Sequence, residues 1–141
     1  ILTSPLFGVS ILKLGFPLFI LFLSLYIFGI TLGLFVSSGL MRYGPSFENI
    51  AWSSLFLLAP LGCIYYPIEI LPEFFQVIAK GLPLVYIFDE TRNILINGLV
   101  DYENIKQAYL LNLVYLIFGI GLFYLSFLRA RVKGTLINMG E

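Results

Sequence analysis

The sequence predicts an all-α integral membrane protein with three transmembrane helices and a re-entrant or interfacial helical hairpin before the last helix. Two observations carry this prediction. The 141 residues are 60% hydrophobic and 11% charged, whereas a soluble domain is about 25% charged, so polar side chains are too few to cover a soluble core. The eight basic and eight acidic residues also leave three long stretches of the chain without any charge.

The first segment, residues 1–12, is expected to be the end of a preceding helix followed by an external turn, since Pro5 and Gly8 interrupt it. The chain starts at Ile1 without the charged region and cleavage site of a signal peptide. We therefore expect a piece of a longer protein.

Residues 13–41 are predicted to form the first transmembrane helix. Positions 14–40 carry no charge, and this stretch exceeds the roughly 20 residues that a helix needs to cross a bilayer. Gly29 and Gly33 form a G-x-x-x-G pair, a spacing that lets a neighbouring helix approach closely. Because glycine is common in membrane helices in general, a packing role and no role both stay open.

Residues 42–48 are predicted to be a short cytoplasmic loop. Arg42 and Glu48 bracket Gly44 and Pro45. Charges at such a position are more often simple interface charges, but a loop of this kind also suits the docking of a cytoplasmic partner.

The second charge-free stretch predicts a transmembrane helix over residues 49–68. Pro60 is expected to kink this helix, because proline removes a backbone donor, and Pro67 is expected to end it at the outer surface. Cys63, the single cysteine, is expected to be inert packing.

The segment 69–106 is apolar enough to resemble a fourth span over residues 82–100, but its charges argue against one. Asp89, Glu90 and Arg92 would lie near mid-membrane, at a cost of about 8–10 kcal/mol against a return of roughly 3–5 kcal/mol from the apolar side chains. The sequence therefore predicts an extracellular excursion rather than a span.

Two short amphipathic helices fit this excursion, one over 71–80, ended by Gly81 and Pro83, and one over 84–97, ended by Gly98. In the second helix one face is apolar at helical spacing, and Asp89, Glu90, Asn93 and Asn97 are expected to lie largely off it. The predicted apolar face consists of Leu84, Ile87, Phe88, Thr91 and Leu95.

Pro72, Pro83, Glu90 and Arg92 are the candidate functional residues of this hairpin. Charges at membrane depth are functional candidates by default. The favoured interpretation is that Asp89 or Glu90 pairs with Arg92 and anchors the hairpin at the headgroup level; a direct role in transport is the alternative.

The third charge-free stretch predicts the last transmembrane helix over residues 107–128, followed by a tail over 129–141. Arg129, Arg131 and Lys133 cluster directly after it, and such clusters favour the cytoplasmic side. We therefore expect a multi-pass protein of the cell membrane with a cytoplasmic C-terminus.

The sequence lacks the residues that several classes of protein need for their function. The chain has no His and one Cys, which argues against a metal site and a histidine base. It has no phosphate loop, zinc-protease helix or nucleophile elbow. Its net charge of zero does not attract nucleic acid. We expect no enzyme activity, no metal and no cofactor.

A set of short motifs follows a fixed order along the chain. The pieces are the Gly29/Gly33 pair, Met41-Arg42-Tyr43-Gly44, Ala51-Trp52, Tyr66-Pro67-Ile68-Glu69-Ile70-Leu71-Pro72, Leu82-Pro83-Leu84, Glu90-Thr91-Arg92, Ile94-Leu95 and Gly98. No single piece is specific, but the ordered set, over about residues 41–98, resembles the C-terminal half of the transmembrane domain of type-2 ABC (ATP-binding cassette) exporter permeases.

The resemblance implies a six-helix permease of which this chain would hold the last three helices and the hairpin. It also implies a dimer of two permease copies with cytoplasmic ATPase subunits, no ATPase motif in the permease itself, and a secondary ATPase contact at Arg42, Gly44 and Glu48. The alternative is a non-transporting membrane scaffold or assembly subunit, because no buried ionisable residue is expected in the three predicted spans and ion-coupled carriers usually need one.

Overall fold

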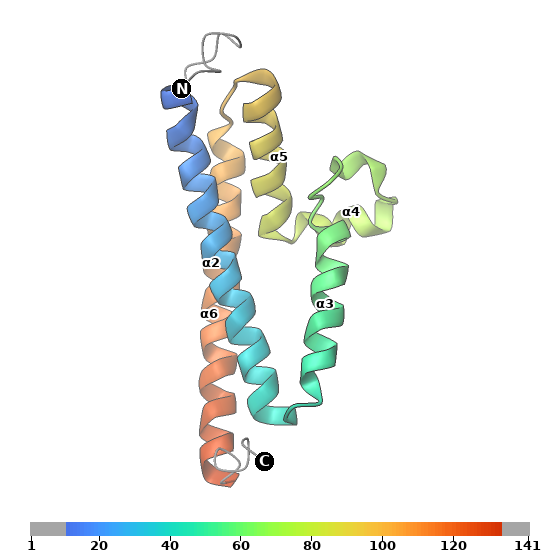
Figure 1. Ribbon diagram of the computed structural model, residues 1–141, viewed down its shortest axis with the longest axis vertical. Coiled ribbons are helices and arrows are strands. Elements are labelled where there is room, and N and C mark those ends of the chain that lie inside the picture. Colours follow the sequence, from blue (N-terminus) through green and yellow to red (C-terminus); the bar gives the residue numbers. More distant parts are fainter. Residues whose placement is uncertain (1–10, 134–141) are drawn as a thin grey trace.

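The computed structural model describes residues 11–133, and this part of the chain is all-helical, as predicted, with no strand. Figure 1 shows two long helices side by side and a shorter arm of helices that leaves one end of the pair and returns to the other. The elements are α2 (Ile11–Tyr43), α3 (Phe47–Leu61), the 3-10 turn η1 (Ile68–Ile70), α4 (Glu73–Lys80), α5 (Pro83–Asn97) and α6 (Tyr102–Lys133).

Two of these helices are long and apolar enough to cross a membrane, namely Gly15–Tyr43 within α2 and Tyr102–Val132 within α6. Length and composition therefore favour association with a membrane. The predicted third span over 49–68 is not confirmed. The helix there, α3, has 15 residues, which at 1.5 Å per residue reach about 22 Å and not the roughly 30 Å of a hydrocarbon core.

The end of α3 also corrects the predicted roles of two prolines. The helix stops one residue after Pro60, so Pro60 does not kink a helix that continues. Beyond it the Gly62 amide donates to the Leu58 carbonyl, and Cys63 takes the left-handed conformation with φ of 53°. Pro67 precedes η1 and does not end α3. A residue at positive φ cannot continue a right-handed helix, which is why the segment 62–67 is irregular.

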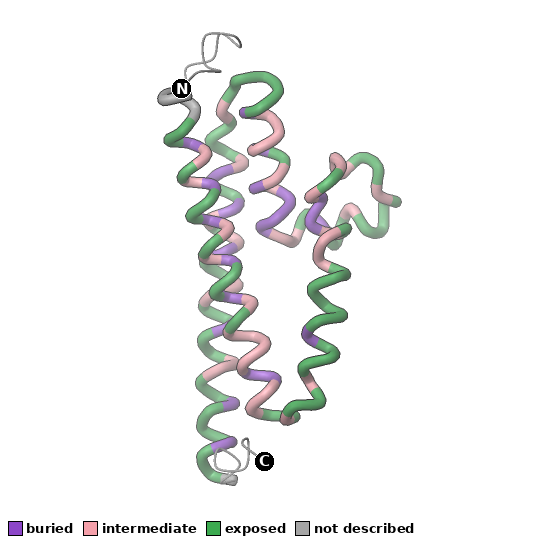
Figure 2. Tube along the Cα trace, viewed as in Figure 1, coloured by how far each residue is buried: buried purple, intermediate pink, exposed green. Residues whose placement is uncertain are grey.

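The helices α2 and α6 run parallel, and their contact follows a repeat of alternating three- and four-residue steps. In α2 the inward positions are Leu21, Ser24, Phe28 and Thr31, all buried. Such a period of 3.5 residues is the seam of a two-helix coil. Figure 2 shows buried residues along this contact, whereas most residues of α3 are exposed.

Small and polar side chains recur every seven residues along the seam. Ser24, Thr31 and Ser38 face the matching positions 112, 119 and 126 of α6, a constant offset of 88 residues. Lipid tails supply no hydrophobic force between membrane helices, so close approach and interhelical hydrogen bonds stabilise such pairs. The seam therefore has the composition of a membrane helix interface.

Hydrogen bonds from both side chains and backbone carbonyls connect the two helices along this seam. The Asn112 amide donates to the Ser24 carbonyl at 2.9 Å and to the Ser24 hydroxyl at 2.7 Å. The hydroxyls of Ser38 and Ser126 lie 2.7 Å apart. The Tyr109 hydroxyl, nearer the start of α6, donates to the Ile20 carbonyl at 2.8 Å. These bonds determine the register of α6 on α2.

The predicted pair of short helices in the excursion is confirmed, with α4 starting at Glu73 and not at residue 71. Pro72 is the extended residue immediately before α4, and Pro83 is the first residue of α5, where its missing amide is not needed. Gly98 ends α5 with φ of 66°, a left-handed conformation that glycine adopts without steric cost.

The flanking boundaries differ from the predicted ones because the long helices extend beyond the charge-free stretches. α2 continues through Arg42 to Tyr43, so only residues 44–46 separate it from α3 and Glu48 lies in the first turn of α3. α6 spans 102–133 and includes the first residues of the predicted tail. Basic residues are favourable at a helix C-terminus. The predicted segment 1–12 ends inside α2, and its residues 1–10, like tail residues 134–141, lie outside the described part.

Candidate functional site

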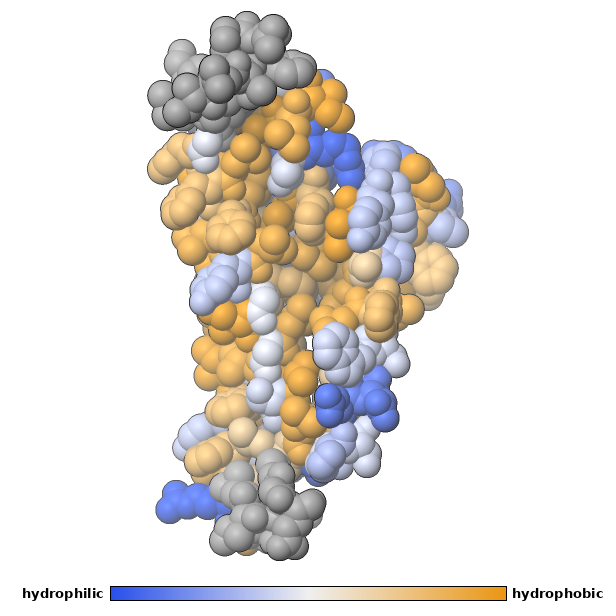
Figure 3. Space-filling model, in the orientation of Figure 1, coloured by the Kyte–Doolittle hydropathy of each residue, from blue (hydrophilic) through white to orange (hydrophobic). Residues whose placement is uncertain are grey.

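The candidate site is the polar end of α5, where this helix meets the start of α6 and the segment after α3. Figure 3 shows a strongly hydrophilic patch at this level on a surface that is otherwise largely hydrophobic. The apolar half of α5 packs into a core with Leu21 of α2 and Ile105 of α6, through Ile87 and Ile94. This packing holds the polar groups of α5 in place.

Glu90 is completely buried, which corrects the prediction that it lies off the packed face of α5. The buried face contains Ile87, Glu90 and Ile94, whereas Leu95, predicted to belong to it, is 68% exposed. The carboxylate of Glu90 accepts the Asp101 amide at 2.7 Å and the Asn104 side-chain amide at 3.2 Å.

These hydrogen bonds explain why a carboxylate is tolerated in a packed interface. The start of α6 has amides without a helical partner and carries the positive end of the helix dipole, so a negative charge is favourable there. The Asp101 carboxylate in turn accepts a hydrogen bond from the Glu103 backbone amide at 3.0 Å. Glu90 thus connects the end of α5 to the first turn of α6 instead of pairing with Arg92.

Arg92 connects α5 to a different neighbour. Its guanidinium donates to the Cys63 carbonyl at 3.1 Å and lies 3.5 Å from the Asp89 carboxylate. The predicted local pairing of an acid with Arg92 is therefore present, with Asp89 as the acid. Carbonyls at the end of a helix lack helical partners, and Arg92 satisfies one of these in the irregular segment after α3.

An open polar cleft of about 220 Å³ lies on this end of the molecule. Five of its six lining side chains are polar, and three of them are asparagines. The lining residues are Asp89, Arg92, Asn93, Ile96, Asn97 and Asn104. Arg92 is among the residues predicted from the sequence and Asn104 is not, because the contact of α5 with α6 cannot be inferred from the sequence of either helix alone.

The two candidate prolines lie away from this cleft. Pro83 is buried at the other end of α5, seven residues or about 10 Å from Glu90 along the helix axis. Pro72 is exposed at the start of α4. Pro83 begins α5, Pro72 directly precedes α4, and neither lines the cleft. The four residues of the predicted hairpin site therefore do not form one cluster.

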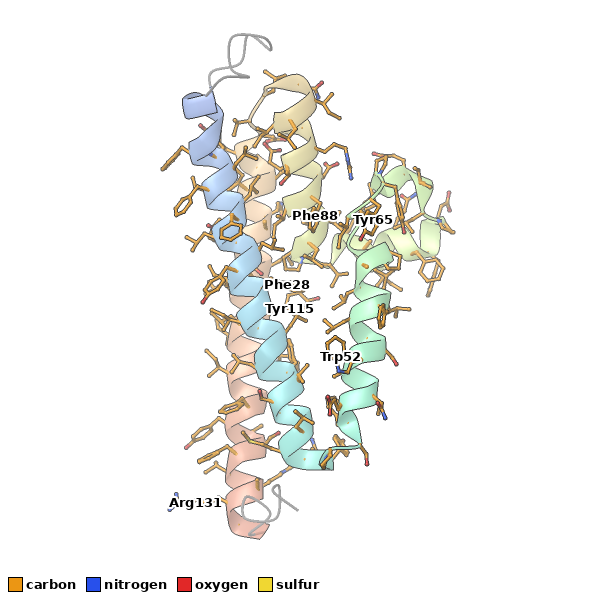
Figure 4. The ribbon with its side chains drawn as sticks, viewed as in Figure 1. Phe28, Trp52, Tyr65, Phe88, Tyr115 and Arg131 are labelled. Carbon is orange, nitrogen blue, oxygen red and sulfur yellow. The ribbon has the colours of Figure 1, made fainter. Side chains whose placement is uncertain are left out.

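The turn between α4 and α5 contacts the middle of α6. The Tyr115 hydroxyl donates to the Gly81 carbonyl at 3.1 Å, and Figure 4 shows Tyr115 beside Phe28 at the α2–α6 contact. The rings of Phe28 and Tyr115 pack edge to face with centroids 6.4 Å apart. This contact determines how deep the hairpin lies along the bundle.

The predicted packing glycines, Gly29 and Gly33, lie on a face of α2 that no other helix in residues 11–133 covers. A Cβ placed on either glycine has nothing within 4 Å. A shallow groove of about 460 Å³ lies beside Gly29. A role for this pair in packing against another chain stays a prediction.

The glycine at the contact between α2 and α6 is Gly119. A Cβ there would lie 3.6 Å from Leu34 and from Thr31 of α2. The sequence signal for this seam is the seven-residue spacing of Ser24, Thr31 and Ser38, which is a different pattern from G-x-x-x-G.

The residues predicted to face a cytoplasmic partner lie together at the corner between α2 and α3. Arg42 lies over the ring of Tyr43, with 5.7 Å from its guanidinium carbon to the ring centroid. Gly44 takes a left-handed conformation with φ of 75°, and Glu48 is exposed in the first turn of α3. Contact of this corner with a partner stays a prediction.

The described residues contain no group of three or more His, Cys, Asp or Glu side chains that could hold a metal ion. The cleft offers amide, carboxylate and guanidinium groups, which suit binding through hydrogen bonds. Comparison of the chain with known protein families, with curated proteins and with solved structures finds no match.

Proposed function

We propose that this chain is part of the membrane permease of an ATP-driven exporter of the type-2 ABC class. In this proposal a cytoplasmic ATPase subunit hydrolyses ATP, and a second permease copy completes the pathway. The chain supplies a pair of long helices and a re-entrant hairpin. The ordered motifs of the sequence support the class, and the fold supports a role in transport.

The depth of the α4–α5 turn carries the proposal. Lys106 is the last charged residue before the long apolar part of α6, and Tyr115 lies nine residues further on, about 14 Å along the axis. Because the Tyr115 hydroxyl donates a hydrogen bond to the Gly81 carbonyl, the α4–α5 turn would lie near the middle of a bilayer of roughly 30 Å. Irregular backbone at that depth is tolerated only inside protein or beside a water-filled cavity.

Charged side chains beside this turn support the same conclusion. Lys80 is exposed immediately before Gly81, and Glu73 is exposed at the start of α4. A charge facing lipid at mid-membrane costs about 2.5–3.5 kcal/mol on insertion scales. An aqueous pathway or a partner subunit on this side of the molecule removes that cost.

The parallel course of α2 and α6 supports a further crossing between them. If both helices span the membrane in the same direction, the chain must return across it between residues 44 and 101. α3 runs back along part of this distance, and the hairpin completes it (Figure 1). This path supports a multi-pass protein with three crossings.

The distribution of basic residues supports the orientation. Since α2 and α6 run parallel, Arg42 at the end of α2 lies at the same end as Arg129 and Arg131 of α6. Basic residues next to spans favour the cytoplasmic side. The corner formed by Arg42, Gly44 and Glu48 then faces the cytoplasm, where an ATPase subunit would bind.

The test is to purify the tagged full-length protein from its native membrane and to measure bound subunits and ATP hydrolysis. We expect a stoichiometric partner with a phosphate loop and vanadate-sensitive hydrolysis. Glu48→Lys should weaken this association, while the matched control Glu103→Lys, at the opposite end of the molecule, should not. Absence of such a partner and of ATP hydrolysis would refute the proposal and favour a scaffold.

A further inference from the structure

We propose that the cleft between α5 and the first turn of α6 binds an uncharged, hydroxyl-rich ring, that is, a sugar or a sugar-like headgroup. This inference concerns binding by the cleft itself and goes beyond the proposed function, because binding requires neither an ATPase nor transport. The hydrogen-bonding groups of the lining that have no partner within residues 11–133 determine which ligand fits.

Asn104 presents an acceptor to the cleft. Its amide nitrogen donates to the Glu90 carboxylate at 3.2 Å, and a carboxylate can only accept. The orientation of the side-chain amide is therefore determined by chemistry, with the nitrogen toward Glu90. Within residues 11–133 the Asn104 oxygen has no hydrogen-bond partner, so it is available to a ligand donor.

Asn93 and Asn97 together present one free amide nitrogen and one free amide oxygen. The Asn97 nitrogen donates to the Asn93 oxygen at 2.8 Å, which leaves the Asn93 nitrogen and the Asn97 oxygen free among the described residues. Exchanging the nitrogen and oxygen in both side chains again leaves one nitrogen, which donates, and one oxygen, which accepts. This pair thus matches a hydroxyl group, which donates and accepts at once.

The charged residues of the lining disfavour charged ligands. Asp89 and Arg92 lie 3.5 Å apart, so each partly neutralises the other. A phosphate could use the remaining Arg92 donors, but it would face the free oxygens of Asn97, Asn104 and Asp89, all of them acceptors. An ammonium group would meet the Arg92 guanidinium. A neutral ligand with several hydroxyls satisfies donors and acceptors without this repulsion.

The size and shape of the cleft limit the ligand to about one ring. Its volume of about 220 Å³ is below the roughly 300–1,000 Å³ of pockets for drug-sized molecules. Ile96 is the single apolar side chain of the lining, and it offers a surface for the C–H face of a sugar ring. The cleft is open, which leaves room for a chain or lipid attached to that ring.

The experiment measures binding of uncharged methyl glycosides and myo-inositol to the purified full-length protein in nanodiscs. Sugar-based detergents must be removed first, because they would occupy the cleft. Saturation-transfer NMR reports which ring protons contact the protein, and inorganic phosphate and choline serve as charged competitors. We expect saturable binding of at least one neutral ring, with no competition by either ion.

Variants localise the binding to the cleft. We expect Asn93→Ala/Asn97→Ala to weaken it at least tenfold, since it removes two hydrogen-bonding groups from an exposed part of α5. The matched control is Asn49→Ala, an exposed asparagine on α3. Equal helix content by circular dichroism confirms that the variants fold.

Three results would each overturn the inference. The first is that no neutral ring of the panel binds saturably. The second is that phosphate or choline displaces the ring, which would assign the cleft to a charged headgroup. The third is that the Asn93/Asn97 double variant binds as tightly as the Asn49 control. None of these results depends on whether an ATPase subunit associates with the protein.

Discussion

Replacing Gly119 by leucine should separate α2 from α6, whereas the same change at Gly121 should not. A Cβ at position 119 would lie 3.6 Å from Leu34 and Thr31, which is ordinary van der Waals contact. Alanine therefore fits, but the further carbons of leucine have no space between the helices. A Cβ at position 121 has nothing within 4 Å, and this residue is exposed.

The comparison of the two leucine variants isolates the packing effect. Both replace a glycine in the same helix, so the gain of up to about 1 kcal/mol in helix propensity is common to both. Overpacking a close interface costs about 1–3 kcal/mol. We therefore expect Gly119→Leu to be about 1–3 kcal/mol less stable than Gly121→Leu, and Gly119→Ala to be as stable as the unmodified protein or up to about 1 kcal/mol more stable.

The free energy of unfolding can be measured by adding SDS to the protein in mild-detergent micelles. Circular dichroism and the fluorescence of Trp52, the single tryptophan, follow the transition. Equal stability of the two leucine variants, or a less stable Gly121→Leu, would refute the parallel seam between α2 and α6.

Three further predictions test the register, the arginine contact and the buried carboxylate. The double variant Ser38→Cys/Ser126→Cys, in a Cys63→Ala background, should form a disulfide rapidly on mild oxidation because the two native hydroxyls lie 2.7 Å apart. If non-reducing gels show no crosslink, the register of α6 on α2 is contradicted. Arg92→Leu should speed maleimide labelling of the native Cys63, because it removes the side chain that donates to the Cys63 carbonyl. Cys63 itself is 2% exposed. An unchanged labelling rate would contradict the role of Arg92 in holding the segment after α3. Glu90→Leu should be about 1–3 kcal/mol less stable in SDS titration than Glu90→Gln, since the glutamine oxygen can still accept the hydrogen bond from the Asp101 amide and leucine cannot. Equal stabilities would argue against this cap.

The arrangement of α2 and α6 shows how far a pattern in one helix can be interpreted. The Gly29/Gly33 spacing marks a face of α2 that permits close approach of another helix. The contact with α6 instead uses a different face, on which Ser24, Thr31 and Ser38 recur every seven residues. Both patterns coexist on one helix. Which of them meets α6 depends on the path of the chain between residues 44 and 101.

Glu90 shows why a charged residue can be misplaced by periodicity alone. A charge in an amphipathic helix is normally assigned to the solvent face, because burial of an unpaired charge is costly. Here the first turn of α6 supplies hydrogen bonds and the positive end of a helix dipole. Those groups come from a helix that the local pattern of α5 does not contain.

The sequence by itself determined the all-helical class, the two long apolar helices and the two short helices of the hairpin. These features follow from local causes, namely charge-free stretches, prolines at helix starts and Gly98 at a helix end. Only the tertiary structure decided the early end of α3 at Leu61, the depth of the hairpin and the burial of Glu90. These depend on contacts between residues far apart in the chain, whose free energies exist only after the helices have packed.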